Sequence, residues 1–140
     1  MGEIRTKVRL TNAVDDELQR RGDLAPADVR WVEVDAVVDT GAVRSVVPVH
    51  IADRLGLQTK RHVLVRYADG RSESVPMTGP VIFDILFRET FEETLVLGDT
   101  VLIGQTVLEK LDLLANCNGR RVMPHPDRPD QPVSMLRRLC

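Results

Sequence analysis

The chain has 140 residues, enough for one domain whose hydrophobic core needs no disulfide or metal to hold it. A formal net charge of −2 argues against an electrostatic nucleic-acid binder, and 43% hydrophobic residues exclude a disordered chain. We expect no secretory signal and no membrane partner, because no apolar run approaches the roughly 20 residues of a membrane span. With Cys117 and Cys140 alone, we expect no zinc site, no other metal or cofactor, and a reducing, cytoplasmic location.

The first part of the chain predicts two strands and a short helix. Residues 4–11 and 29–38 alternate between apolar and polar side chains, which is typical of half-buried strands. The polar segment 15–28 predicts a loop with at most one short helical turn. Residues 48–55 predict a short helix, because proline suits its first position and Gly56 suits its C-terminal cap.

Strand pairs dominate the rest of the chain. Asp69-Gly70 between residues 63–67 and 72–75 predicts a hairpin. The prolines and glycine within 76–80 are expected to interrupt the following strand, which suits a bent or edge strand better than a central one. A capping box over Thr106–Glu109 predicts a second short helix. Further strands are expected at residues 45–47, 81–87, 92–97 and 101–103, and a closing hairpin at 113–123.

This tally of about eight short strands and two short helices predicts a mainly β fold with the turn spacing of a barrel or sandwich. We expect residues 1–123 to form the domain, and the prolines of 124–140 predict an extended or mobile tail. Glu92-Glu93 is expected to be a solvated strand start. The phenylalanines are expected to line the core or a groove: Phe83, Phe87 and Phe91.

The candidate chemistry lies in Asp39-Thr40-Gly41-Ala42, directly after a run of apolar β residues. A carboxylate that emerges from a core can have its protonation tuned by burial. Glycine lets the backbone approach a substrate closely, and the threonine hydroxyl can hold the turn by hydrogen bonds. The segment therefore suits the activation of water by a carboxylate, and the alternative is a plain turn that closes the strand.

This segment, with Ser45 three positions after Ala42, resembles the catalytic motif of the retroviral-type aspartic proteases, the retropepsins and their cellular relatives. Leu102-Ile103-Gly104 followed by a short helix is similar to their second signature. The Asp69-Gly70 hairpin falls where such proteases carry the flap. The resemblance covers residues 4 to 123 in order and is strongest to small bacterial members of this aspartic protease clan.

The resemblance implies a single-lobe acid-protease β-barrel with two short helices that closes as a twofold dimer. Family members hydrolyse peptides with two aspartates that share one proton. The chain holds one such motif. The resemblance therefore implies a homodimer in which each copy contributes one Asp39 to a shared site for a peptide or protein substrate. It also implies catalytic positions at Asp39, Thr40 and Gly41, and substrate-binding positions at Ala42, Tyr67, Ala68, Asp69, Gly70, Arg71, Ile103 and Gly104.

Two positions depart from the retroviral pattern. Val43 and Gln105 stand where viral enzymes usually have an acidic residue and an arginine, so that ion pair cannot form. One alternative function is therefore a catalytically weak or silent protease-fold module that dimerises or binds peptides. Another alternative is a domain cut from a larger polypeptide, with residues 124–140 as a former linker.

Overall fold

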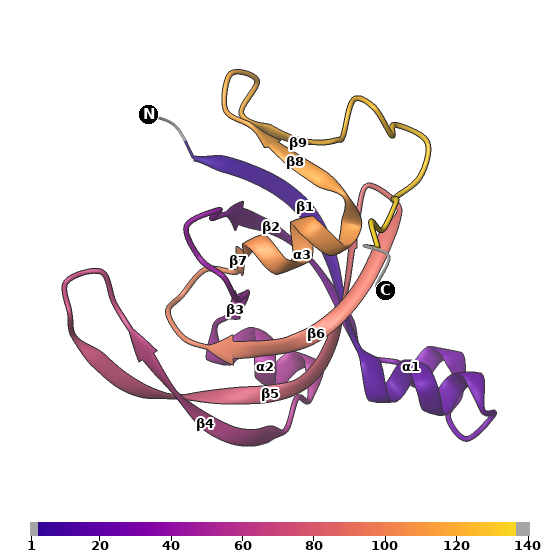
Figure 1. Ribbon diagram of the computed structural model, residues 1–140. Coiled ribbons are helices and arrows are strands. Elements are labelled where there is room, and N and C mark those ends of the chain that lie inside the picture. Colours follow the sequence, from indigo (N-terminus) through magenta and orange to yellow (C-terminus); the bar gives the residue numbers. More distant parts are fainter. Residues whose placement is uncertain (1–2, 137–140) are drawn as a thin grey trace, which may run out of the picture.

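The computed structural model describes residues 3–136, which form a mainly β fold with three α-helices (Figure 1). This confirms the expectation of a mainly β fold, although the prediction of two helices was wrong. The helices are α1 (Ala13–Arg20), α2 (Val49–Leu55) and α3 (Gln105–Leu111), with a short 3-10 helix, η1, over Pro26–Asp28. The strands are β1 (Ile4–Asn12), β2 (Trp31–Val38), β3 (Val46–Val47), β4 (Thr59–Arg66), β5 (Ser72–Ile85), β6 (Arg88–Val96), β7 (Leu102–Ile103), β8 (Leu113–Asn116) and β9 (Arg121–Pro124).

Six of the strands close into a ring. The larger sheet has the order β1-β2-β7-β3-β6-β5-β4, and β1 also pairs with β5, so that β4 alone lies outside the ring. Most neighbours are antiparallel, but β2 pairs in parallel with β7, and β3 with β6. The hairpin of β8 and β9 forms a separate two-stranded sheet. Ring closure pairs strands that are far apart in the sequence and leaves few free sheet edges.

One apolar core fills the ring. Leu10, Phe83 and Ile103 from three different strands are completely buried, and the apolar faces of α2 and α3 pack against them through Leu55 and Leu108. Burial of each such side chain contributes about 1.5–3 kcal/mol relative to exposure. A smaller cluster of Val46, Val75, Met77 and Leu95 joins the base of the β4–β5 hairpin to β3 and β6.

The segment expected to be a loop contains α1. The Asn12 side chain accepts a hydrogen bond from the Asp15 amide at 3.0 Å and donates one to the Leu55 carbonyl at 2.8 Å. Asp15 is buried and pairs with Arg30 at 2.8 Å, and hydrogen bonds from Arg30 lower the pKa of the carboxyl. The loop prediction was wrong because this short helix is stabilised by its cap and by these contacts rather than by an apolar face.

β5 continues through the residues that were expected to interrupt it. Pro76 pairs with His62 of β4, and the register against β6 shifts between Met77 and Pro80. Such an irregularity accommodates proline, which has no amide hydrogen for the ladder. β5 is therefore one bent strand of 14 residues that takes part in both the hairpin and the ring.

The two expected helices are present, but neither begins as predicted, since Pro48 is the N-cap of α2 rather than its first residue. α2 ends at Gly56, whose φ of +64° is the left-handed conformation that favours glycine, as predicted. α3 begins at Gln105 after an N-cap at Gly104 and has no side-chain cap. The predicted capping box is wrong because the Thr106 hydroxyl contacts Val43 and Glu92 instead.

Phe83 lies in the core, as predicted, and Phe87 and Phe91 each line a surface hollow. Phe83 is buried, whereas Phe87 is fully exposed at the tight β5–β6 turn. Leu86 and Phe87 both have positive φ in this turn, +52° and +64°. Phe91 is 64% exposed and lines a groove. The prediction of a solvated Glu92 was wrong, since only 8% of the residue is exposed.

The described part of the tail is attached to the domain. Pro124 pairs with Leu113 in the β8–β9 hairpin, so the expected boundary at 123/124 falls inside β9 and the domain division stays a prediction. Beyond β9, Arg128 pairs with Asp112 at 2.5 Å, and the Val133 amide donates to the same carboxylate at 3.1 Å. Residues 137–140, with Cys140, lie outside the described residues.

Within residues 3–136, none of the helices combines the length and the apolar composition that a membrane crossing requires.

Candidate functional site

Asp39 lies directly after β2, in the turn that leads to β3. Its amide donates a hydrogen bond to the Ile103 carbonyl at 2.9 Å, and its own carbonyl accepts one from Ala42 at 3.1 Å. The carboxylate is half-buried and its Oδ1 accepts from the Gly41 amide at 3.0 Å, its one hydrogen bond within residues 3–136. The backbone of Asp39 is thus fixed, while its carboxylate keeps lone pairs that can bind water or a ligand.

The predicted second signature packs against this turn. Val38 lies opposite Ile103 in the parallel pairing of β2 with β7. The buried Gly104 amide donates to Ser45 Oγ at 2.9 Å, and the Gln105 amide donates to the Ala42 carbonyl at 2.8 Å. Two segments that are remote in sequence are therefore joined by hydrogen bonds along their length.

Gly104 is the point of closest approach between these segments. A Cβ atom at this position would lie 2.6 Å from the Arg44 carbonyl carbon and 2.9 Å from the Val43 carbonyl oxygen. These separations are far below van der Waals contact. Close packing therefore requires glycine at this position of the second signature, since any side chain here would displace the turn after Asp39.

A buried carboxylate supports the chain just beyond the Asp39 turn. Glu92 of β6 accepts a hydrogen bond from Thr106 Oγ1 at 2.8 Å and pairs with Lys110 Nζ at 2.9 Å. Thr106 Oγ1 also lies 3.0 Å from the Val43 carbonyl, so its single hydrogen can serve either acceptor. A buried charge is costly without such partners. The Glu92 network thus links β6 and α3 to the backbone of Val43.

Sequence reasoning missed the Glu92 network. The signal that was available is the spacing of Thr106 and Lys110, since residues four apart on a helix share a face. Nothing local in the sequence places Glu92 opposite that face, because the packing of α3 on β6 joins segments separated by the whole of β7.

The β4–β5 hairpin ends in the predicted tip, Tyr67–Arg71. The Tyr67 amide donates to the Arg71 carbonyl at 2.8 Å, and Gly70 has a φ of +90° that the tight turn requires. Asp69 pairs with Arg71 at 2.7 Å, and the Tyr67 hydroxyl contacts the Glu73 carboxylate, which raises the pKa of Tyr67. Ala68 is exposed at this tip. The tip is therefore held by its own contacts.

The structure brings some of the predicted site residues together and leaves others apart. Asp39 contacts the buried Ile103, and the buried Gly104 contacts Ser45 just beyond Ala42, whereas Thr40 and Gly41 are exposed. In the part of the chain that the structure describes, no hydrogen bond joins the Tyr67–Arg71 tip to Asp39–Ala42. In Figure 1 the tip and the β2–β3 loop project to the same side of the view.

The chemistry available at this site is that of a carboxylate. A half-buried carboxylate can take a proton from water or, once protonated, give one to a substrate. Among residues 3–136, no group of three or more His, Cys, Asp or Glu side chains is placed to hold a metal ion.

Comparison with known proteins adds one family. Residues 25–82 match the family model described as "Aspartyl protease". The match contains Asp39–Ala42 and the Tyr67–Arg71 tip, and it ends before Leu102–Gly104. No curated protein matches the chain. The match supports an aspartyl protease family and a peptidase activity, and the ring of β-strands is consistent with an aspartic protease fold.

Proposed function

We propose that the protein is a retropepsin-like aspartic endopeptidase that acts as a homodimer with one Asp39 from each subunit. The observation that carries the proposal is the Asp39 turn. Its backbone is fixed by Ile103 and Ala42, while its carboxylate is open to a ligand. The family match over residues 25–82 supports the same chemistry.

In the proposed mechanism, two Asp39 carboxyls share one proton. Two carboxylates about 3 Å apart cannot both ionise readily, as is known for aspartic proteases. The ionised carboxylate takes a proton from water as the water oxygen attacks the peptide carbonyl, and the protonated one gives its proton to the carbonyl oxygen. The tetrahedral intermediate then collapses as the leaving nitrogen is protonated.

A second copy of the chain is needed because the sequence holds a single motif of this kind. Thr40 is exposed, and its hydroxyl forms no hydrogen bond within residues 3–136. We assign it the role of joining the two turns near the twofold axis. Two identical turns would then face each other through the same residues, as a twofold interface requires.

The proposed substrate is an extended peptide that lies between the Asp39 turn and the hairpin tip. Gly41 and Ala42 would offer backbone groups to it, and Tyr67–Arg71 would close over it, with hydrogen bonds between strands supplying affinity. Ile103 and Gly104 are buried, so their contribution to substrate binding would be to hold the turn.

The test is cleavage of a diverse peptide library by the wild type and by Asp39→Asn. We expect Asp39→Asn to lose pepstatin-sensitive cleavage and to keep the dimeric mass, whereas Asp35→Asn, an exposed carboxylate on β2, keeps both. Cleavage by Asp39→Asn at the wild-type rate would contradict the proposed mechanism.

The second candidate function is a peptide-binding or dimerisation module with little or no cleavage. Val43 and Gln105, in place of an acid and an arginine, and a hairpin tip without a hydrogen bond to the Asp39 turn favour it. Wild-type protein that binds peptides and cuts none of them from about pH 3 to pH 8 would support this function instead.

A further inference from the structure

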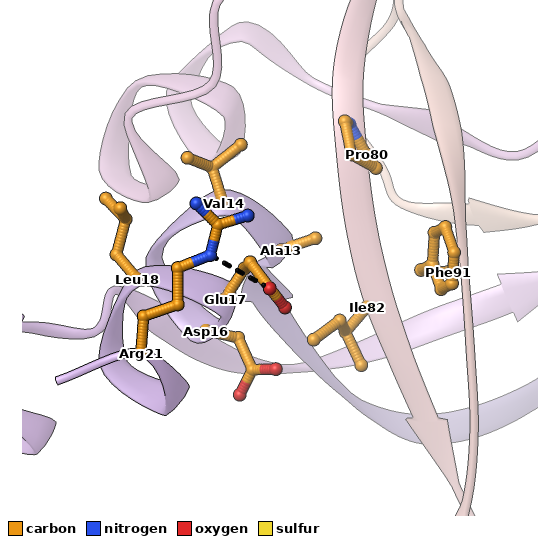
Figure 2. Close-up of a pocket in the computed structure, with 9 residues that line it drawn as sticks. All are labelled: Ala13, Val14, Asp16, Glu17, Leu18, Arg21, Pro80, Ile82 and Phe91. Carbon is orange, nitrogen blue, oxygen red and sulfur yellow. Dashed lines mark hydrogen bonds and ion pairs between the residues drawn. The ribbon is translucent and has the colours of Figure 1, made fainter. Parts of the chain in front are cut away.

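Two adjoining hollows, taken together as one groove in two parts, lie between the loop after Asp39 and the side of α1. Its first part, about 660 Å³, is lined by Val43 and Arg44 of that loop and by Lys60 of β4. Its second part, about 450 Å³, lies between α1 on one side and β5 and β6 on the other (Figure 2). Pro80 and Phe91 line both parts, so the two parts adjoin at these residues.

We propose that this groove binds a segment of the protein substrate that lies outside the residues held at Asp39. The segment carries an acidic residue, which pairs with Arg44 and Lys60, and an apolar residue, which packs between α1 and Phe91. The inference rests on the proposed peptidase function and names a feature of its substrates.

The end of the groove at α1 is suited to an apolar side chain. Val14 of α1 is 52% exposed and Phe91 is 64% exposed, and Ile82 lies in the same lining (Figure 2). The charged residues at this end are neutralised within α1 and its C-terminal cap, by the pairs Asp16–Arg20 at 2.8 Å and Glu17–Arg21 at 3.1 Å. These exposed apolar side chains lie in one hollow whose charged residues are already paired, so an apolar side chain of a partner can enter it without separating a charge from its partner.

The end of the groove near Asp39 is suited to a carboxylate. Lys110 pairs with Glu92 at 2.9 Å, and Arg61 pairs with Glu93 at 2.8 Å. Arg44 and Lys60 are exposed and form no ion pair within residues 3–136. The four cations and two carboxylates of this lining give it a charge of +2, in a chain whose formal net charge is −2. Complementary charge of this kind selects an acidic partner.

Both walls of the groove are fixed in the free protein. The α1 wall is held by the Asn12 cap and the Asp15–Arg30 pair, and the Val43 wall is held by Thr106. The Lys60 side chain lies over Gly79, where a Cβ would be 3.2 Å from Lys60 Cε. Because the groove is already formed before binding, ordering its walls adds little to the entropy cost of binding. A peptide that occupies both parts must pass Pro80 and Phe91, and the first part is lined by Val43 and Arg44 of the loop after the Asp39 turn.

The test measures binding separately from cleavage. The probe is a fluorescein-labelled peptide with a pair of glutamates followed, after a glycine–serine spacer of varied length, by leucine. Two control peptides carry lysine for glutamate or serine for leucine. Fluorescence anisotropy with the Asp39→Asn protein gives the affinities, and we expect the acidic and apolar probe to bind at least about tenfold more tightly than either control.

Matched variants locate the binding to the groove. We expect Phe91→Ser and Lys60→Glu to weaken probe binding about tenfold or more. We expect Phe87→Ser and Lys7→Glu, at exposed positions outside the groove, to leave it unchanged. In protein with an intact Asp39, Phe91→Ser should raise KM and not change kcat for a cleavable peptide that carries the extension.

The outcomes distinguish the groove proposal from the peptidase proposal. Equal affinity for the three peptides, or no effect of Phe91→Ser and Lys60→Glu, would overturn the groove assignment even if the wild type cuts peptides. A change in dimeric mass in Phe91→Ser without a change in peptide affinity would also overturn it, since the groove would then be a contact between copies. Groove-dependent binding without any cleavage by the wild type would support the groove and contradict the peptidase.

Discussion

The buried amide of Gly104 donates a hydrogen bond to the Ser45 hydroxyl, 2.9 Å away. This bond ties the start of α3 to the chain between the Asp39 turn and β3. Ser45 is completely buried, so neither group can turn to water instead. The geometry of the Asp39 turn therefore depends on a contact between two segments that meet only in the folded chain.

Removal of that hydroxyl tests the contact. Ser45→Ala leaves the Gly104 amide buried without an acceptor, which costs about 1–3 kcal/mol of unfolding free energy. Urea denaturation followed by circular dichroism measures the change. Ser74→Ala, at an exposed position of β5, is the matched control and should change the stability by less than about 0.5 kcal/mol. Equal stabilities of the two variants would show that the buried bond contributes nothing.

A methyl group at Gly104 tests the steric argument. Gly104→Ala places Cβ 2.6 Å from the Arg44 backbone, so the turn must shift, at a cost of about 1–3 kcal/mol. At Gly119 the nearest atom outside the adjacent residues, Arg121 Cγ, would be 3.5 Å from a Cβ, an ordinary contact. Thermal unfolding should therefore show a lower Tm for Gly104→Ala than for Gly119→Ala, and the reverse order would contradict the close approach.

The Glu92 network predicts that the hydroxyl at position 106 matters more than the shape of the side chain. Thr106→Val keeps the shape and removes the hydrogen bond to the buried Glu92 carboxylate, which costs about 1–3 kcal/mol. Thr106→Ser keeps the hydroxyl and should retain most of the stability. Guanidinium denaturation of both variants gives the comparison, and a serine variant as unstable as the valine variant would indicate that the lost methyl contact is responsible.

The Asp112–Arg128 pair predicts a loss of stability in acid. Hydrogen bonds from Arg128 hold the pKa of Asp112 at about 2, below its ordinary value of 3.8. A carboxylate whose pKa is lowered on folding stabilises the protein above its ordinary pKa, and this contribution disappears as the pH falls toward the lowered value. The unfolding free energy should therefore fall between about pH 4 and pH 2 more steeply in the wild type than in Asp112→Asn.

The control for this pH dependence is Asp130→Asn. Asp130 is exposed and forms no ion pair within residues 3–136, so its replacement should leave the wild-type slope intact. Parallel slopes for the wild type and Asp112→Asn would mean that Arg128 does not stabilise the ionised carboxylate.

The sequence predicted the elements with strong local signals and missed those that depend on distant contacts. Gly56 and the Asp69-Gly70 turn require particular backbone conformations, and α2 and the β4–β5 hairpin accordingly appear where expected. α1 was missed although Asn12 offers a cap signal, because its polar composition resembles a loop. The continuity of β5 across Pro80 depends on its pairing with β6, which no local pattern reveals.

Some features of the candidate site were likewise predictable from local sequence signals, and others were not. The sequence predicted the two signatures, Asp39–Ala42 and Leu102–Gly104, but not that they contact each other, which follows from the pairing of β2 with β7 and the close approach at Gly104. The Glu92 network and the groove beside α1 could not be predicted, since each depends on how a helix packs on the sheet. The roles of Asp39, Thr40 and Gly41 in catalysis stay predictions.

The central claim, that an active centre needs one Asp39 from each of two chains, is tested most directly by mixing wild-type protein with Asp39→Asn. Chains that exchange freely between dimers leave an activity per wild-type chain equal to the wild-type fraction, about one tenth at a ninefold excess of the variant. The account predicts this proportional loss of peptide cleavage. Activity per wild-type chain that stays constant at every ratio, in samples shown by mass to exchange subunits, would contradict it.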